Sequence, residues 1–485
     1  MRVDEYLTCD ALQLADLLRA GDVTSEMLMR HAMALADACE PLNAIAYRDD
    51  EMALQEAKHA SREGVFAGIP FLLKDSSLAW RQMPYGLGSR LFNDIRLDYD
   101  ATLATRFRRL GLIPFGRTSV PELCMAPTTE AVHNGGPTLN PWDHSRSSGG
   151  SSGGAAVAVS LGIVPMAHGS DGGGSIRIPA ACCGVYGLKP SRGLIPAGPR
   201  RGEIWGGLAT DGVLSRTVRD TAAALDGIAG AEVGAPYAAP AFSGSYLEAV
   251  RNAASAPRMT VHAWTCAWPG IEVDSSCLHA VHGVMDLCRA LGHTVIEAPL
   301  PELDYEAFVQ AHIDILATHI VVAVDARRHA LGAKPIVGDL EPAIDDGYAY
   351  GLTLTAARYA AAMQEIHAVG YAMQAATARA DLVLTPTLTQ LPVRLGEMTM
   401  RNTFQAFRRK VARYATFLAV VNASGQPAAN VPVCWSENNL PVGTQLIGPV
   451  GGEGRILQLS AELEQAAPWH ERRPFPQGSG AFACR

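Results

Sequence analysis

The segment 149–190 constrains the fold and the function of this chain most, because it joins two glycine-rich loops through an apolar run that carries no charge. The first loop, GGSSGG, contains Ser151, and the second, DGGGS, ends on Ser175, which lies 24 positions further on. Consecutive glycines adopt positive φ angles and leave their N–H groups unobstructed, so several amides can converge on one anion. A serine hydroxyl at the end of such a loop is typical of a nucleophile beside an oxyanion hole.

The apolar run between the loops indicates how the two serines can meet. The run is too long for a single strand, and Gly162 and Pro165 interrupt it. We therefore expect a short helix over about 152–161 and a buried strand over 163–167. That geometry returns the chain to its starting edge and places both serines at one site.

Three different meanings of these glycines compete with this one. A phosphate-binding P-loop needs a Gly-Lys-Ser/Thr sequence, and no lysine follows the glycines at 153, 154 or 174. Residues 149–153 also fit the G-x-S-x-G nucleophile elbow, but that elbow follows a strand directly and residues 140–148 read as a loop. A flexible linker is the commonest meaning of Gly/Ser clusters, yet a solvated linker would not be joined on both sides to buried apolar segments.

The second constraint is Lys74, which ends the apolar stretch GIPFLLK and so is predicted to end a buried strand. Only five of the 40 basic residues are lysines, and lysine is the basic side chain that can lose its proton and act as a base. Burial of an ammonium group lowers its pKa and favours the neutral amine. The alternative is that Lys74 pairs with Asp75 or extends its charged end to the surface.

The composition indicates which kinds of binding partner and which cellular compartment to expect for this protein. The net charge of −8 over 485 residues argues against nucleic acid or an anionic membrane as a partner. We expect no membrane-spanning helix, because Ser160, Gly162 and Pro165 interrupt the apolar run, and the charged start MRVDEYLTCD is unlike a signal peptide. Ten cysteines without a CxxC pair suit a reducing cytoplasm, and the sequence indicates no metal site and no cofactor.

Secondary-structure patterns predict an α/β fold. Helical spacing runs over 8–38 and 50–63, and the stretch from about 270 to 380 is largely helical. Strand patterns appear at 381–387, 425–432 and 441–448. Strands at both ends with helices between them favour a single large domain with a mixed, mostly parallel twisted sheet that helices cover on both faces.

Taken in order, the motifs resemble those of the amidase signature family. They are GIPFLLKD at 68–75, GGSSGG at 149–154 and GSDGGGSIRIPA at 169–180, with shorter matches at 100–102, 116–122, 140–142, 187–191 and 422–427 and a closing Pro-Trp pair. The resemblance covers most of the chain, and several spaced motifs agree in order. It implies that Ser175 is the nucleophile, that Ser151 is a bridging serine held by a cis peptide, and that Lys74 is the general base.

The same resemblance implies roles for the residues around Ser175. The amides of Gly172, Gly173, Gly174 and Ser175 would form the oxyanion hole, and a backbone carbonyl near Met125 would contact the substrate. Many family members have Thr or Ile where this chain has Gly172, which we expect to loosen the loop slightly.

Two further residues of this motif, Asp171 and Arg177, match family positions that brace the loop. The substrate pocket should be lined by residues 195–230 and 300–410. Candidates within these ranges are Trp205, Phe308, His312 and Ile315.

For organisation, the resemblance implies one domain over 1–485. N-terminal helices would occupy 1–63, a catalytic core 64–230 and 380–475, and a variable, mainly helical region on the substrate side 231–379.

For function, the resemblance implies a cytoplasmic serine hydrolase that cleaves C–N bonds of linear or cyclic amides, most like the aminohexanoate cyclic-dimer hydrolases. Its partner would be a small amide or carbamate, and the chain could form a homodimer. Carbamates or aryl esters remain alternative substrates. The chain could also be the glutaminase subunit of a tRNA-dependent amidotransferase, or a catalytically inactive binding module. The intact Lys/Ser/Ser set speaks against the inactive module.

Overall fold

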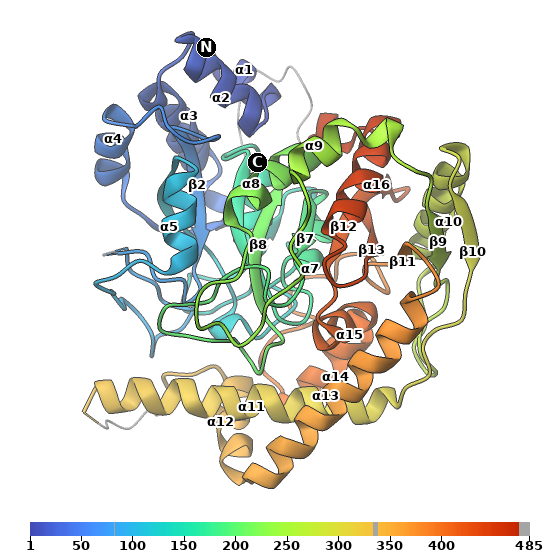
Figure 1. The fold of residues 1–485 in the computed structure, drawn as a ribbon. Coiled ribbons are helices and arrows are strands. Elements are labelled where there is room, and N and C mark those ends of the chain that lie inside the picture. Colours follow the sequence, from blue (N-terminus) through green and yellow to red (C-terminus); the bar gives the residue numbers. More distant parts are fainter. Residues whose placement is uncertain (82, 333–337, 475–485) are drawn as a thin grey trace.

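One large α/β domain is built around an 11-stranded sheet, as the computed structural model shows for residues 1–81, 83–332 and 338–474 (Figure 1). The last residues of the expected domain, 475–485, lie outside the described residues. In spatial order the strands are β1 (Ile45–Arg48), β3 (Leu112–Thr118), β2 (Ile69–Lys74), β6 (Met166–Asp171), β8 (Thr210–Ser215), β7 (Tyr186–Lys189), β12 (Ala428–Trp435), β13 (Pro441–Ile447), β11 (Leu382–Pro386), β9 (Thr260–Ala263) and β10 (Thr294–Glu297). A separate hairpin pairs β4 (Leu139–Asn140) with β5 (Asp143–Ser147).

The strand directions confirm the predicted mixed sheet. Strands β3, β2 and β6 run parallel at one side, and β11, β9 and β10 run parallel at the other. Between them, β6, β8, β7, β12, β13 and β11 pair antiparallel in succession. Parallel pairs are therefore fewer than expected. One reason is the short turn after β12, which forms a hairpin where a parallel pair would need a long crossover.

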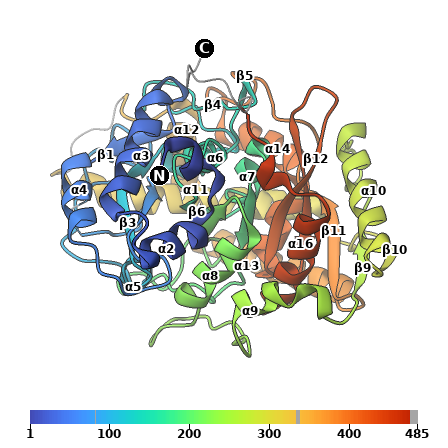
Figure 2. The same ribbon diagram turned by 90° about the horizontal axis from the view of Figure 1, so that it is seen from above.

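Helices cover both faces of this sheet and extend below it (Figures 1 and 2). Their bounds are α1 (Val3–Thr8), α2 (Ala11–Ala20), α3 (Ser25–Ala38), α4 (Asp50–Lys58), α5 (Thr102–Arg109), α6 (Gly153–Ser160), α7 (Arg177–Cys183), α8 (Val218–Ile228), α9 (Tyr246–Arg251), α10 (Ser275–Ala290), α11 (Tyr305–Ala330), α12 (Pro342–Thr353), α13 (Ala356–Thr377), α14 (Phe404–Tyr414), α15 (Thr416–Ser424) and α16 (Glu453–Ala466). The predicted N-terminal helices are confirmed, and the Thr24 side chain caps α3 by accepting from the Met27 amide. The region 231–379 is mainly helical but also supplies β9 and β10 to one end of the sheet.

The connection between the two glycine-rich loops differs from the expectation in one respect. The helix lies where it was predicted, as α6, and every residue of it is buried. The strand is shifted, however, because Gly162, with φ of 77°, and the residues up to Pro165 form a turn, so β6 begins at Met166. The shift carries the strand directly into the second glycine-rich loop at Asp171.

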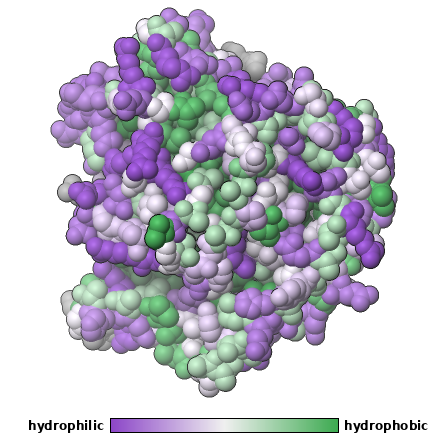
Figure 3. All heavy atoms as spheres, in the orientation of Figure 1, coloured by the Kyte–Doolittle hydropathy of each residue, from purple (hydrophilic) through white to green (hydrophobic). Residues whose placement is uncertain are grey.

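Helix α11 corrects the expectation about membrane spans. By length and composition alone, this 26-residue helix is apolar enough to cross a membrane. However, 61% of its most apolar window is buried inside the protein, as in the core helix of a soluble protein. Val322 is a large hydrophobic residue of this helix that is exposed. On the face drawn in Figure 3, hydrophobic residues lie in small groups among hydrophilic ones.

Candidate active site

The ends of two neighbouring strands bring the predicted residues together. Strand β2 ends at Lys74 and β6 ends at Asp171, and the two strands pair in parallel, so both ends lie at the same edge of the sheet. Ser151 lies just before the start of α6, and its peptide bond to Gly150 is cis. Ser151 and Ser175 line one cavity.

Lys74 is fully buried and is hydrogen-bonded at its amine. The Nζ atom lies 2.7 Å from Ser151 Oγ, 2.9 Å from Ser170 Oγ and 3.1 Å from the Ser170 carbonyl. Burial lowers the pKa of Lys74, and electrostatic interactions with Cys124, Asp211 and Asp171 oppose this effect only in part. The alternative that Lys74 extends to the surface is therefore wrong. Asp75 instead accepts from the amides of Gly86 and Gly88.

A buried histidine supports the backbone of Lys74. His168 Nδ1 lies 3.2 Å from the Lys74 amide and must accept its hydrogen bond, so the ring carries its proton on Nε2. Nε2 lies 3.1 Å from Asp211 Oδ1, and burial lowers the pKa of His168, which keeps the ring neutral. Neither residue was predicted from the sequence, because their pairing depends on the alignment of β2, β6 and β8.

The Asp171–Arg177 pair fixes the start of the second glycine-rich loop. Both side chains are fully buried, and Arg177 donates to both carboxylate oxygens of Asp171, at 2.8 and 2.9 Å. Asn422 donates to the same carboxylate, and Gln445 accepts from Arg177. Burial raises the pKa of Asp171, but the charge and hydrogen bonds of Arg177 outweigh this effect and hold the pKa well below its usual range. This geometry fits the bracing role that the resemblance implies.

The amides of the loop are not equivalent. The Gly174 amide donates to Asp171 Oδ1 at 2.8 Å and is therefore already used in holding the loop. Within the described ranges, the amides of Gly172, Gly173 and Ser175 have no hydrogen-bond partner. Of the four amides named from the sequence, these three are the ones open to an anion.

Trp205 explains why Gly172 has no side chain. A Cβ at Gly172 would lie only 2.5 Å from Trp205 Cε3 and 3.0 Å from the Ala209 Cβ. The indole packs on the loop at this point, so the glycine here is required for packing. The expectation that Gly172 loosens the loop is not what the contacts indicate.

The carbonyl of Met125 has a partner in the protein. Arg408 on α14 donates to it from NH1 at 2.9 Å. Met125 lines the cavity, as expected, but one lone pair of its carbonyl is occupied. The neighbouring Cys124 thiol also lines the cavity; burial raises its pKa, and Lys74 and a hydrogen bond with Ser151 oppose this.

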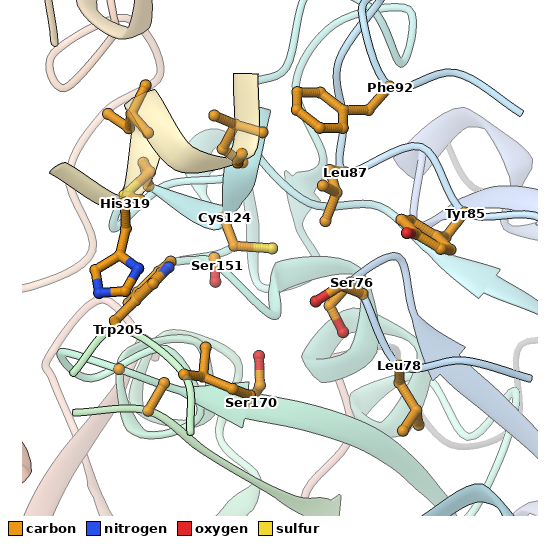
Figure 4. Close-up of a pocket in the computed structure, with 18 of the residues that line it drawn as sticks. Ser76, Leu78, Tyr85, Leu87, Phe92, Cys124, Ser151, Ser170, Trp205 and His319 are labelled. Carbon is orange, nitrogen blue, oxygen red and sulfur yellow. The ribbon is translucent and has the colours of Figure 1, made fainter. Parts of the chain in front are cut away.

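The cavity above the serines has a volume of about 530 Å³ and lies between the sheet edge and α11. Figure 4 shows side chains from well-separated segments pointing into it, with Trp205 and His319 on one side, and Tyr85, Leu87 and Phe92 on the other. Of the pocket candidates from the sequence, only Trp205 lines this cavity. The wall formed by 76–95 was not predicted, since its residues carry no motif.

The remaining pocket candidates lie away from this cavity. Phe308 and His312 surround smaller cavities behind the loop, and Ile315 is buried in α11. Within the described residues, no group of three or more His, Cys, Asp or Glu side chains could hold a metal ion.

Comparison with known proteins gives the family. The family model described as Amidase matches residues 26–457, and the chain belongs to this family. The 6-aminohexanoate-cyclic-dimer hydrolase of Pseudomonas sp. (strain NK87) is 32% identical over 477 residues, which is 96% of each protein. A solved structure of a 6-aminohexanoate cyclic dimer hydrolase complexed with substrate matches with a TM-score of 0.90 at 32% identity, over 96% of this chain and 99% of that one.

A bacterial aryl acylamidase of the amidase signature family matches with a TM-score of 0.86 at 26% identity, over 96% of this chain and 98% of that one. Together with the family match, these relatives make the protein an amide-hydrolysing enzyme that acts on C–N bonds.

Proposed function

We propose that this enzyme cleaves amides through an acyl-enzyme formed on Ser175, with Ser151 as a proton relay and Lys74 as the general base. The observation that carries the proposal is the 2.7 Å contact between Lys74 Nζ and Ser151 Oγ in a fully buried setting. A neutral amine can accept a proton from a serine hydroxyl, whereas a charged ammonium cannot.

The proton balance follows from this arrangement. Lys74 accepts the proton of Ser151 while Ser151 accepts that of Ser175, and Ser175 Oγ then attacks the amide carbonyl. The relay runs in reverse to protonate the leaving nitrogen, which departs as a free amine and leaves an ester on Ser175. Water attacks this ester, with the same groups removing its proton, and the carboxylic acid is released.

The second glycine-rich loop supplies the electrostatic part of the mechanism. The unpaired amides of Gly172, Gly173 and Ser175 are candidates to donate to the oxyanion. Asp171 holds the loop through its contacts with the Gly174 amide and with Arg177, so these donors are oriented before the substrate arrives.

We further propose that the substrates are linear or cyclic amides with apolar chains. The cavity is lined mainly by apolar side chains, among them Leu78, Leu87, Phe92 and Ile320. The relatives named for hydrolysing a cyclic amide dimer support this choice. Carbamates would use the same groups, and the similarity to an aryl acylamidase supports anilides as a second class to test. We also propose that the enzyme works in the cytoplasm, as a homodimer, without a cofactor.

The test is the release of amine or alcohol from a panel of aliphatic amides, anilides, carbamates and aryl esters by the purified protein. We expect aliphatic amides, linear or cyclic, to give the highest kcat/KM, and Ser175→Ala to lose the activity on all of them. A protein that hydrolyses esters but no amide would contradict the proposed substrate class. Activity that survives in Ser175→Ala would contradict the proposed mechanism.

A further inference from the structure

Arg408 is a buried cation that has no acidic partner among the residues that the structure describes. Its side chain on α14 is 9% exposed, and within the described residues its guanidinium has one hydrogen bond, to the Met125 carbonyl at 2.9 Å. The Nε atom is buried without any partner there. Burial lowers its pKa to about 10, so the group is charged at neutral pH.

This charge faces the reaction centre from behind the oxyanion loop. Arg408 lines a cavity of about 20 Å³ together with Gly172, Gly173 and Ser175. It also lines an adjoining cavity of about 10 Å³ among apolar residues of α11 and α14. This small space adjoins the 530 Å³ cavity, because Met125 and Trp205 line both.

Neither titratable neighbour in the small cavity supplies the missing negative charge. Burial raises the pKa of the Cys124 thiol, so it stays neutral, and the other neighbour is a histidine. His312 on α11 lines both small cavities and lies against Gly173. Burial and then the Arg408 charge lower the pKa of His312 to about 3, against a smaller opposing effect of the Gly172 backbone. The ring is therefore neutral throughout the working range and can donate or accept a hydrogen bond.

A buried guanidinium without a counter-charge is costly, and one carbonyl compensates it only in part. Guanidinium groups bind carboxylates through two parallel hydrogen bonds, which are stronger than bonds between neutral groups. We propose that Arg408 binds a carboxylate of the substrate, so that the preferred amides carry a carboxylate on a short chain near the scissile bond. This inference rests on the proposed function, because it places the carboxylate relative to Ser175.

The carboxylate has two chemical sources. It can belong to the acyl part, as in the monoamide of a dicarboxylic acid, or to the amine part, as in an N-acyl amino acid. In both cases it takes no part in bond making or breaking. The small cavity holds the charged end, and the large apolar cavity holds the rest of the molecule.

The experiment compares two pairs of amides in which –COO⁻ is replaced by –CH₂OH. Glutaric acid monoamide is paired with 5-hydroxypentanamide, and N-hexanoyl-β-alanine with N-(3-hydroxypropyl)hexanamide. We expect the wild type to prefer the carboxylate in at least one pair by about tenfold or more in kcat/KM, mainly through KM. The pair that shows the preference identifies the acyl or the amine part as the source.

Variants of α14 then assign the preference. Arg408→Met should abolish it, and Arg408→Lys should retain part of it. Arg409→Met is the matched control, because Arg409 lies next in sequence but pairs with Glu306 and with the side chain of Gln310 away from the site. It should keep the wild-type preference. Circular dichroism checks the folding of each variant.

Two results would overturn the inference. One is a wild type without preference in either pair, which decides the question even where Arg408→Met does not fold. The other is an Arg408→Met enzyme that loses activity on all four substrates equally, as a purely structural contact to Met125 would require. In both cases, cleavage of the neutral amides by the wild type that depends on Ser175 would leave the proposed function intact. If the wild type cleaved none of the amides, the proposed function itself would be refuted.

Discussion

Replacing Gly172 by alanine tests the geometry of the oxyanion loop with a change of one carbon atom. The added Cβ would lie 2.5 Å from Trp205 Cε3 and 2.6 Å from Cζ3. Carbon atoms in contact prefer about 3.5–4.0 Å, so the loop or the indole must move by about 1 Å. The φ angle of Gly172 is outside the positive range, and the backbone therefore accepts alanine.

The expected loss follows from that displacement. Overpacking of this kind costs about 1–3 kcal/mol of stability. A displacement of about 1 Å in the groups around a reacting centre lowers the rate by about 10²-fold. We expect Gly172→Ala to fold and to lose between about 10- and 100-fold in kcat/KM.

Gly173→Ala is the matched control in the same loop. Its Cβ would meet His312 Cε1 at 3.4 Å, an ordinary contact, so the variant should stay within about threefold of the wild type. In a Trp205→Leu background the cost of Gly172→Ala should shrink, and the double-mutant cycle measures this coupling. A Gly173→Ala variant that is more damaging than Gly172→Ala would contradict the predicted clash with Trp205. So would a Gly172→Ala variant that costs the same with and without the indole.

Four further predictions concern the buried polar groups. Lys74→Met and Lys74→Arg should both lose at least about 10²–10⁴-fold in kcat/KM, since neither side chain can accept a proton, and a Lys74→Arg enzyme with substantial activity would contradict the base. The wild-type rate should rise with pH through the pKa of Lys74, which burial places below the usual 10.5, because the neutral amine is the active form; a flat profile up to pH 10 or so would contradict this. Ser151→Ala should fold with an unchanged melting temperature but lose about 10²–10⁴-fold in rate, and near-normal activity would make Ser151 only a turn residue. Asp171→Asn should lower the free energy of unfolding by about 3–5 kcal/mol in urea titrations at pH 7, because Arg177 is left buried without its partner. In the wild type this contribution to stability is present above about pH 4 and is lost on acidification below it. An unchanged free energy of unfolding in the variant would show that the pair does not brace the loop.

The motifs were predictable from the sequence because their chemistry is local. A glycine-rich loop needs no distant residue to expose its amides, and an apolar stretch that ends in Lys74 predicts a lysine at the end of a buried strand. The α/β class, the mixed sheet and helix α6 are confirmed for the same reason.

Other features depend on the tertiary fold and left no local signal. The short strands β9 and β10 have only four residues each and lie within the region 231–379, which was expected to be mainly helical. His168 and Asp211 meet only because β6 pairs antiparallel with β8. Arg408 reaches the Met125 carbonyl over 283 positions of sequence, and no periodicity indicates such a contact.

The central claim is that Ser175 carries the acyl group, and the mass of the intact protein after labelling tests it directly. Incubation with a fluorophosphonate, or with a slowly hydrolysed acylating substrate, should add one group per chain. Peptide mapping should place that group on Ser175, and Ser175→Ala should remain unlabelled. A single adduct on Ser151 or on another serine, or labelling that persists in Ser175→Ala, would contradict the account.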